Sequence, residues 1–171
     1  MGRARLTTRR LVLFALLEAI LVGLQVVMAA FPNIEAVSLL IMAYTVVFGG
    51  GVAYIIAGFV VLEMLLWGFN TWVISYCYVW AVLAILAWLF RGMESRLGWA
   101  ILSGAYGLSF GALCALVYLP IGGPAMFVAT WVAGIPFDLL HCAGNFAMAL
   151  LLFQPCRRVL TALWQRMGDQ Q

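Results

Sequence analysis

The sequence predicts an all-α membrane protein with six transmembrane helices and with both termini in the cytoplasm. Hydrophobic residues make up 67% of the 171 residues, charged residues make up 9%, and the mean hydropathy is +1.11. Soluble domains do not have this composition, so residues 1–171 are expected to form a single integral membrane domain. The nine basic side chains, all arginines, fall in three clusters within 3–10, 91–96 and 157–166. The positive-inside rule assigns all three clusters to the cytoplasmic side.

Four apolar segments are each long enough to cross a bilayer, at 11–31, 72–90, 97–119 and 125–154. The first segment is too long for a signal peptide and lacks a small-residue cleavage site, so we expect a retained helix. The last segment is longer than one span needs and contains Pro136. We therefore expect a kink at Pro136 or a separate outer piece before it.

The segment from 33 to 67 is also apolar, but Gly49-Gly50-Gly51 interrupts it. Glycine in a helix interior costs about 1 kcal/mol relative to alanine, so three in a row favour a turn. A turn here gives two short helices, at 33–49 and 52–67, and places all nine arginines on one side. A single span would give five helices and would put the 91–96 cluster opposite the N-terminal cluster. The prediction is therefore six spans.

Polar and aromatic side chains recur at helical spacing in the outer halves of three predicted helices. Asp138, His141 and Asn145, for example, share one face of the last helix. An acidic residue at the centre of a membrane helix costs about 2.5–3.5 kcal/mol, which calls for a functional reason. These faces and the first outer connection predict an aromatic-walled pocket that opens to the outside. Its expected substrate-binding residues are Asn33, Glu35, Glu63, Trp67, Asn70, Trp72, Tyr76, Trp80, Asp138, His141 and Asn145.

The charge of this predicted pocket indicates the kind of ligand. Glu35, Glu63 and Asp138 have no basic partner on the outer side. A di-anionic ligand would be repelled and would find no arginine clamp. A neutral or cationic nitrogen heterocycle would find carboxylates for its amines and aromatic rings for stacking or cation–π contact.

Structural explanations compete with this interpretation. Trp67 and Trp72 could belong to an interfacial aromatic belt, and Asp138 and His141 could form a structural pair. A metal site at Asp138, His141 and Cys142 lacks a second histidine, and no nucleophile motif surrounds a serine such as Ser109. The four cysteines are isolated and are interpreted as small apolar filler. We expect no metal and no cofactor.

Several stretches of the chain resemble the substrate-binding S components of energy-coupling factor (ECF) vitamin transporters. They are the arginine-rich start, Ala15-Leu-Leu-Glu-Ala19, Phe31-Pro-Asn-Ile-Glu35, residues 99–115 and residues 134–145. The last two stretches are similar to a branch of small six-helix S components linked to queuosine precursors or left without a substrate. The triple glycine departs from the family, where a basic residue is expected.

The resemblance implies a protein of the prokaryotic plasma membrane that binds a vitamin-like molecule on the outer side and topples to deliver it. It also implies a transmembrane T component, which would dock on Ala15 and Ala19 with Glu18 beside them, and two ATPase subunits. The chain itself has no lysine and therefore no P-loop, so it is expected to be a transport subunit without ATPase or other enzyme activity. The net charge of +3 reflects membrane orientation, so no nucleic-acid partner is expected.

Two other functions remain open. One is an ion- or proton-coupled carrier that works alone and uses Glu18, Glu63 and Asp138 as a relay. Such carriers often contain an internal repeat, which this sequence does not show. The other is a small intramembrane enzyme built on Asp138 and His141.

Overall fold

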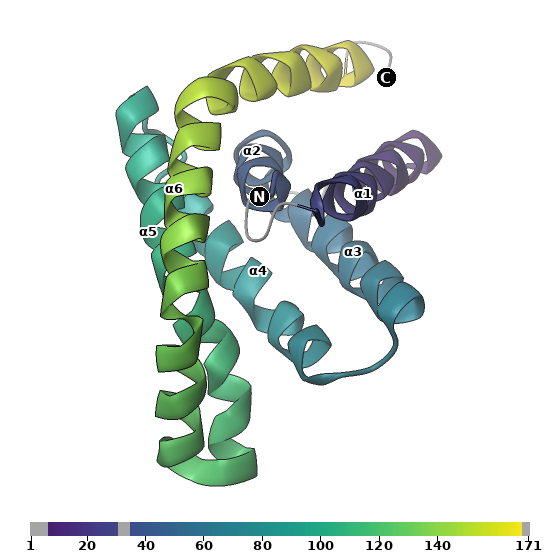
Figure 1. Ribbon diagram of the computed structural model, residues 1–171. Helices are drawn as coiled ribbons and strands as arrows, with labels where there is room; N and C mark the ends of the chain where they lie inside the picture. Colours follow the sequence, from purple (N-terminus) through teal and green to yellow (C-terminus); the bar gives the residue numbers. More distant parts are fainter. Residues whose placement is uncertain (1–6, 31–34, 169–171) are drawn as a thin grey trace.

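The computed structural model describes residues 7–30 and 35–168, and that part of the chain is all-helical, as predicted (Figure 1). No strand occurs among these residues. The helices are α1 (Thr8–Met28), α2 (Val37–Phe48), α3 (Val52–Trp67), α4 (Thr71–Leu89), α5 (Arg96–Ala115) and α6 (Leu119–Gly168). Two short 3-10 turns, η1 (Gly49–Gly51) and η2 (Leu116–Tyr118), connect α2 to α3 and α5 to α6.

Four helical stretches of the described chain are long and apolar enough to cross a membrane. They are Thr8–Met28, Val37–Trp67, Thr71–Leu89 and Arg96–Met167. The second contains the triple glycine, where Gly49 has a φ of 56° and the α-helix is interrupted, as the sequence predicted. The fourth contains the connection between α5 and α6. The second stretch is interrupted at η1 and the fourth at η2, so the four stretches contain six helices. The number of membrane spans stays a prediction.

Side-chain caps explain where three of the helices begin. The hydroxyl of Thr7 accepts a hydrogen bond from the Arg10 backbone N–H at the start of α1. Asn70 accepts from two backbone N–H groups of α4, and Ser95 accepts from that of Gly98 in α5. Each cap satisfies donors that have no partner inside the helix. The caps shift the observed starts of α1, α4 and α5 by one to three residues from the predicted ones.

The predicted start of the last helix, at residue 125, lies next to the break inside α6, but the helix extends beyond the predicted end. Helical backbone angles continue through Pro136, and the non-helical residue inside α6 is Gly123, with φ 72° and ψ −171°. Glycine adopts this conformation without the steric cost of a side chain, and Pro124 suits the first position of the helix that follows. The separate outer piece expected before Pro136 is therefore only the short segment up to Gly123.

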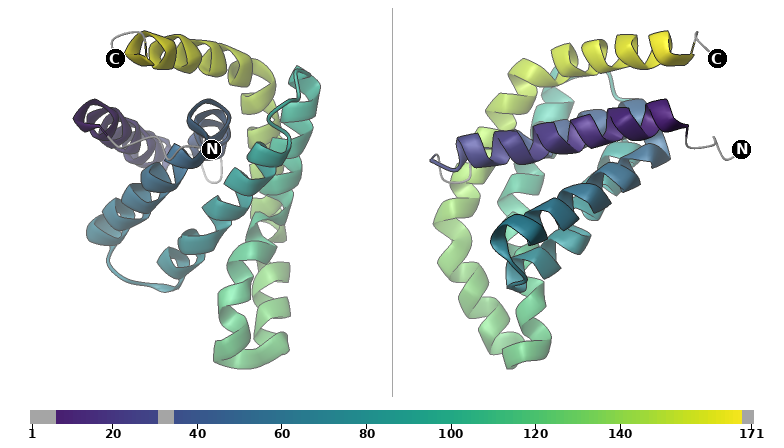
Figure 2. Two further views of the ribbon diagram at one scale, coloured as in Figure 1. Left: turned by 180° about the vertical axis from the view of Figure 1, so that it is seen from behind. Right: turned by 90° about the vertical axis from the view of Figure 1, so that its right-hand side faces the viewer.

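The C-terminal part of α6 continues to Gly168, well beyond the predicted end at residue 154. It bends away from α5 and runs across the other helices, beside the first half of α1 (Figures 1 and 2). The Trp164 ring lies 5.1 Å from that of Phe48 and 6.4 Å from that of Phe14, and the Arg10 guanidinium lies 5.0 Å from the Trp164 ring. Proline is the usual cause of a sharp helix bend, and we attribute this one to Pro155.

The helices cross one another instead of forming a parallel bundle (Figure 2). The long α5–α6 pair forms one side, α3 and α4 run diagonally, and α1 packs on α3. Helix α2 lies in the centre against α4 and α6, and all of its residues except Val46 and Val47 are buried. This central position explains why α2 is apolar on every face.

Small residues at Gly107 and Gly111 bring α5 and α6 close together. A Cβ atom at Gly107 would lie 2.8 Å from the backbone oxygen of His141, and one at Gly111 would overlap the Asp138 carboxylate. Glycine at these positions lets the helix backbones approach, as small-residue motifs do in membranes. Asp138 and His141 lie at this contact between α5 and α6 and are buried.

Candidate functional site

An aromatic ladder on α4 forms one wall of the candidate site. The ring centroids of Trp72 and Tyr76 are 4.6 Å apart, and those of Tyr76 and Trp80 are 5.1 Å apart, both in edge-to-face geometry. The predicted i, i+4, i+8 spacing produces this stack. Phe59 of α3 lies 6.1 Å from both Tyr76 and Trp80 and closes the ladder on one side.

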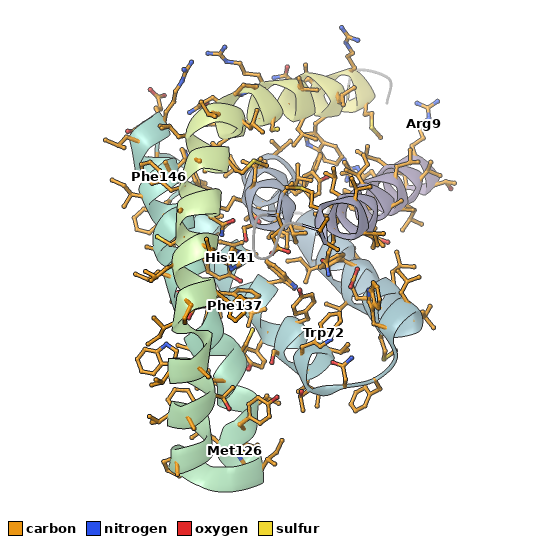
Figure 3. All side chains as sticks on the ribbon, in the orientation of Figure 1. Arg9, Trp72, Met126, Phe137, His141 and Phe146 are labelled. Atoms are coloured by element: carbon orange, nitrogen blue, oxygen red, sulfur yellow. The ribbon has the colours of Figure 1, made fainter. Side chains whose placement is uncertain are left out.

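Phe110 of α5 links the ladder to α6. Its ring lies 5.6 Å from Trp80 and 4.7 Å from His141. Figure 3 shows His141 near the middle of α6 and Trp72 on α4. Side chains from α4, α5 and α6, which are far apart in the sequence, thus form one cluster.

The carboxylates reach this cluster from three elements. Glu35, which precedes α2, has its Oε1 atom 3.6 Å from Nε2 of His141. Glu63 of α3 has no exposed surface and accepts a hydrogen bond of 3.0 Å from the Gln25 amide of α1. Asp138 of α6 accepts a hydrogen bond of 2.8 Å from the Gly111 backbone N–H. Glu35 lies close enough to Glu63 for their charges to interact.

Many buried polar atoms at these positions have no hydrogen-bond partner among the described residues. A buried polar group without a partner costs about 1–3 kcal/mol, so each such group in a native protein needs an explanation. A bound polar molecule or ordered water would supply the missing partners. The atoms are Gln25 Oε1, Ser38 Oγ, Glu63 Oε1, Trp80 Nε1, Ser103 Oγ, Asp138 Oδ2, both ring nitrogens of His141, and Asn145 Oδ1.

Seven of the predicted substrate-binding residues take part in this arrangement. They are Glu35, Glu63, Tyr76, Trp80, Asp138, His141 and Asn145. Six of these seven are buried, and Glu35 is partly buried. Trp72 extends the ladder toward the surface and is only partly buried.

The other predicted residues do not line the buried cluster as expected. Trp67 lies one turn from Glu63 and beside its carboxylate, but it is 57% exposed, a position that suits an interfacial aromatic belt. The Asn70 side chain caps α4, so its side-chain oxygen is already used by the backbone. Asn33 lies outside the described residues.

Sequence reasoning missed four buried or partly buried residues, namely Gln25 and Phe110, which contact predicted site residues, and the serines Ser38 and Ser103. Gln25 is an amide in an otherwise apolar helix, and that signal could have identified it. Ser38 and Ser103 are fully buried, but a single serine in a membrane helix is too common to stand out. Phe110 was missed because an isolated phenylalanine carries no pattern.

The predicted docking residues of α1 lie on its outer face. Ala15 and Ala19 are exposed, and so is Gly23 one turn further along. Glu18 is partly buried against α3, where a Cβ atom at Gly58 would overlap its carboxylate. The face that carries Ala15 and Ala19 is therefore available for a partner.

The residues considered for a metal site or a hydrolase can be located in the described part of the chain. No group of three or more His, Cys, Asp or Glu side chains that could hold a metal occurs in the described part of the chain. The Ser109 hydroxyl donates to the backbone oxygen of Tyr106, and the ring nitrogens of His141 form no hydrogen bond with any described residue. A serine–histidine pair is thus not formed.

An apolar groove of about 560 Å³ lies apart from this cluster, between α3 and α4. Its lining runs from Val52 to Val61 on α3 and from Cys77 to Ile85 on α4, and includes no charged residue and none of the predicted site residues. Its chemistry suits a hydrocarbon chain.

Comparison with known proteins finds no matching family model, no matching curated protein and no matching solved structure.

Proposed function

We propose that this chain is the substrate-capture subunit of an ECF-type importer and binds a vitamin-like nitrogen heterocycle from the outside. The observation that supports this most directly is the set of buried polar atoms without a partner among the described residues, which includes the Trp80 Nε1 atom of the aromatic ladder and the ring nitrogens of His141. A structural core would gain stability by replacing such atoms with apolar groups. A binding site keeps them because the ligand completes their hydrogen bonds.

The charges in the cluster favour a neutral or cationic ligand. Glu35, Glu63 and Asp138 supply acceptors for amine groups, and among the described residues His141 is the group near them that can carry a positive charge. Trp80 and Tyr76 offer ring faces and edges for an aromatic heterocycle. A queuosine precursor or a thiamine-like pyrimidine has this combination of amines and aromatic ring.

We further propose six membrane spans with cytoplasmic termini, in a prokaryotic plasma membrane. This topology is supported by the convergence of the three arginine clusters. Arg10 contacts Trp164 in the C-terminal part of α6, and Arg96, Arg157 and Arg158 line one cavity. The connection from α3 to α4 and the start of α6 lie at the opposite end of the molecule (Figure 1).

The proposed partners are a transmembrane T component and two ATPase subunits, because the chain has no P-loop lysine of its own. The exposed small residues Ala15 and Ala19 offer the T component a surface on which two helices can approach closely.

A pair of variants tests the separation of these roles. Ala15→Trp with Ala19→Trp fills the exposed face and is expected to prevent co-purification with the T component while ligand binding stays intact. Glu63→Gln is expected to do the reverse. If both variants lose the same property, the assignment of one face to docking and one cluster to binding is wrong.

Uptake in proteoliposomes separates this proposal from its rivals. The capture subunit alone is expected to bind ligand without accumulating it. Accumulation driven by an ion gradient would favour the carrier, and chemical conversion of the ligand would favour the enzyme.

A further inference from the structure

We propose that Arg96, Arg157 and Arg158 form a binding site for the phosphate of an anionic phospholipid. The site lies where α5 begins and α6 bends, away from the ligand-binding cluster. It does not depend on the identity of the transported molecule.

Two adjoining polar cavities define the site. One, of about 310 Å³, is lined by Glu94, Arg96, Gln154, Arg157 and Arg158. The second, of about 370 Å³, shares the last three of these residues and extends along α6 to Gln165. The α6 residues that line them are spaced so that they share one side of the helix. The cavities therefore form a polar groove along that side.

The groove carries an excess of positive charge. Three guanidinium groups line it against one carboxylate, that of Glu94. No Asp or Glu side chain among residues 7–30 and 35–168 lies within ion-pair distance of these arginines. The Gln154 amide of α6 donates a 2.9 Å hydrogen bond to the backbone oxygen of Glu94. This bond connects α6 to the segment that precedes α5. Arginine binds phosphate oxygens in bidentate geometry, so the groove fits a phosphate group.

Apolar side chains beside the groove indicate that the phosphate belongs to a lipid. Leu97 and Ile101 of α5 are 53% and 55% exposed, and Leu151 of α6 is 69% exposed. Leu151 lies one turn before Gln154 and on the same side of α6 as Arg158. In a bilayer this flank would contact acyl chains while the arginines hold the headgroup. Basic pockets between helices on the cytoplasmic side bind anionic headgroups in this way.

Native mass spectrometry of the full chain with defined lipids tests the proposal. The detergent-solubilised protein is mixed with phosphatidylglycerol or with phosphatidylcholine, and the bound lipid is counted. We expect preferential retention of phosphatidylglycerol. Arg157→Gln is expected to reduce that retention roughly five-fold, and the matched charge change Arg166→Gln, outside both cavities, is expected to leave it unchanged.

Equal binding of the two lipids, or an equal loss in Arg166→Gln, would overturn the proposal. Inorganic phosphate is then added as a competitor of the bound lipid. If it displaces the lipid at concentrations similar to those of the lipid itself, the groove binds anions in general and the lipid assignment is wrong. Arg157→Lys keeps the charge but loses the bidentate geometry, so it is expected to retain more of the lipid than Arg157→Gln and less than the unmodified protein.

Discussion

Glu63 is the buried residue whose surroundings fit most directly with its proposed role in ligand binding. It has no exposed surface, and one carboxylate oxygen accepts from Gln25 while the other has no partner among the described residues. Only one of the two carboxylate oxygens therefore has a hydrogen-bond donor among the described residues. The unpaired oxygen is the expected acceptor for an amine of the ligand.

Replacing this carboxylate tests the idea. Glu63→Gln keeps the shape of the side chain and removes its charge, so we expect ligand affinity to fall at least roughly ten-fold because a charge-assisted hydrogen bond is lost. Tryptophan fluorescence titration measures the change. Glu94→Gln removes one negative charge at the arginine groove and serves as the control. Unchanged affinity in Glu63→Gln would remove Glu63 from the site.

His141 distinguishes a binding role from a structural pair. His141→Phe retains an aromatic ring beside Phe110 and removes both ring nitrogens. If the nitrogens bind ligand, affinity falls and the thermal midpoint of the ligand-free protein stays the same or rises, because two unpaired buried atoms are removed. If His141 mainly pairs with Glu35, the midpoint falls instead, because the Glu35 carboxylate loses its partner.

At the residue scale, the sequence was informative where several polar side chains repeated at helical spacing. Asp138, His141 and Asn145 could be placed on one face of the helix because the 3.6-residue period of an α-helix determines which residues share a face. Asn70 could not be assigned correctly, since the same side chain suits a ligand contact and a helix cap. Contacts between helices, such as Gln25 with Glu63, depend on tertiary packing that no local pattern encodes.

At the scale of elements, the α5–α6 pair depends on two glycines that face the neighbouring helix. Gly107→Ala would place a Cβ atom against the His141 backbone, which cannot move as a side chain can. We expect a loss of stability of about 1–3 kcal/mol. Thermal unfolding in detergent measures it. Gly134→Ala is the control, because a Cβ there meets no atom within 4 Å and alanine favours the helix. Equal effects at both positions would contradict the packing argument.

The C-terminal part of α6 is held in place by Trp164. Trp164→Ala removes ring contacts with Phe14 and Phe48 and the cation–π contact with Arg10. We expect a loss of about 1–3 kcal/mol and faster amide exchange in residues 155–168. Hydrogen exchange with mass spectrometry reports both. Leu163→Ala, at the neighbouring exposed position, should leave exchange nearly unchanged; an equal effect there would mean that Trp164 does not hold the segment.

The end of α2 was predictable because the triple glycine marks it. The extension of α6 was not. Pro155 and the following arginines end the apolar run, and hydropathy alone treats that point as the end of a span. The extension persists because Leu160 and Trp164 pack on the other helices, which only the folded arrangement reveals.

For the whole molecule, composition was sufficient to predict an all-helical chain with helices able to cross a membrane. The crossing of the helices in Figure 2 was not predictable, because span counting treats every helix as parallel to the bilayer normal. Arg10 contacts Trp164 in the C-terminal part of α6, and Arg96 lines one groove with Arg157 and Arg158. The cytoplasmic location of the three arginine clusters stays a prediction.

The most direct test of the central claim is mass spectrometry of the molecule that co-purifies with the full chain, followed by its titration against tryptophan fluorescence. Trp80 and Trp72 lie in the aromatic ladder, so binding there should change the emission. We predict a stoichiometric neutral or cationic nitrogen heterocycle, with a fluorescence response that is lost in Glu63→Gln. A di-anionic ligand, or a protein that is empty and gives no response to a panel of amine-bearing heterocycles, would contradict the proposed function.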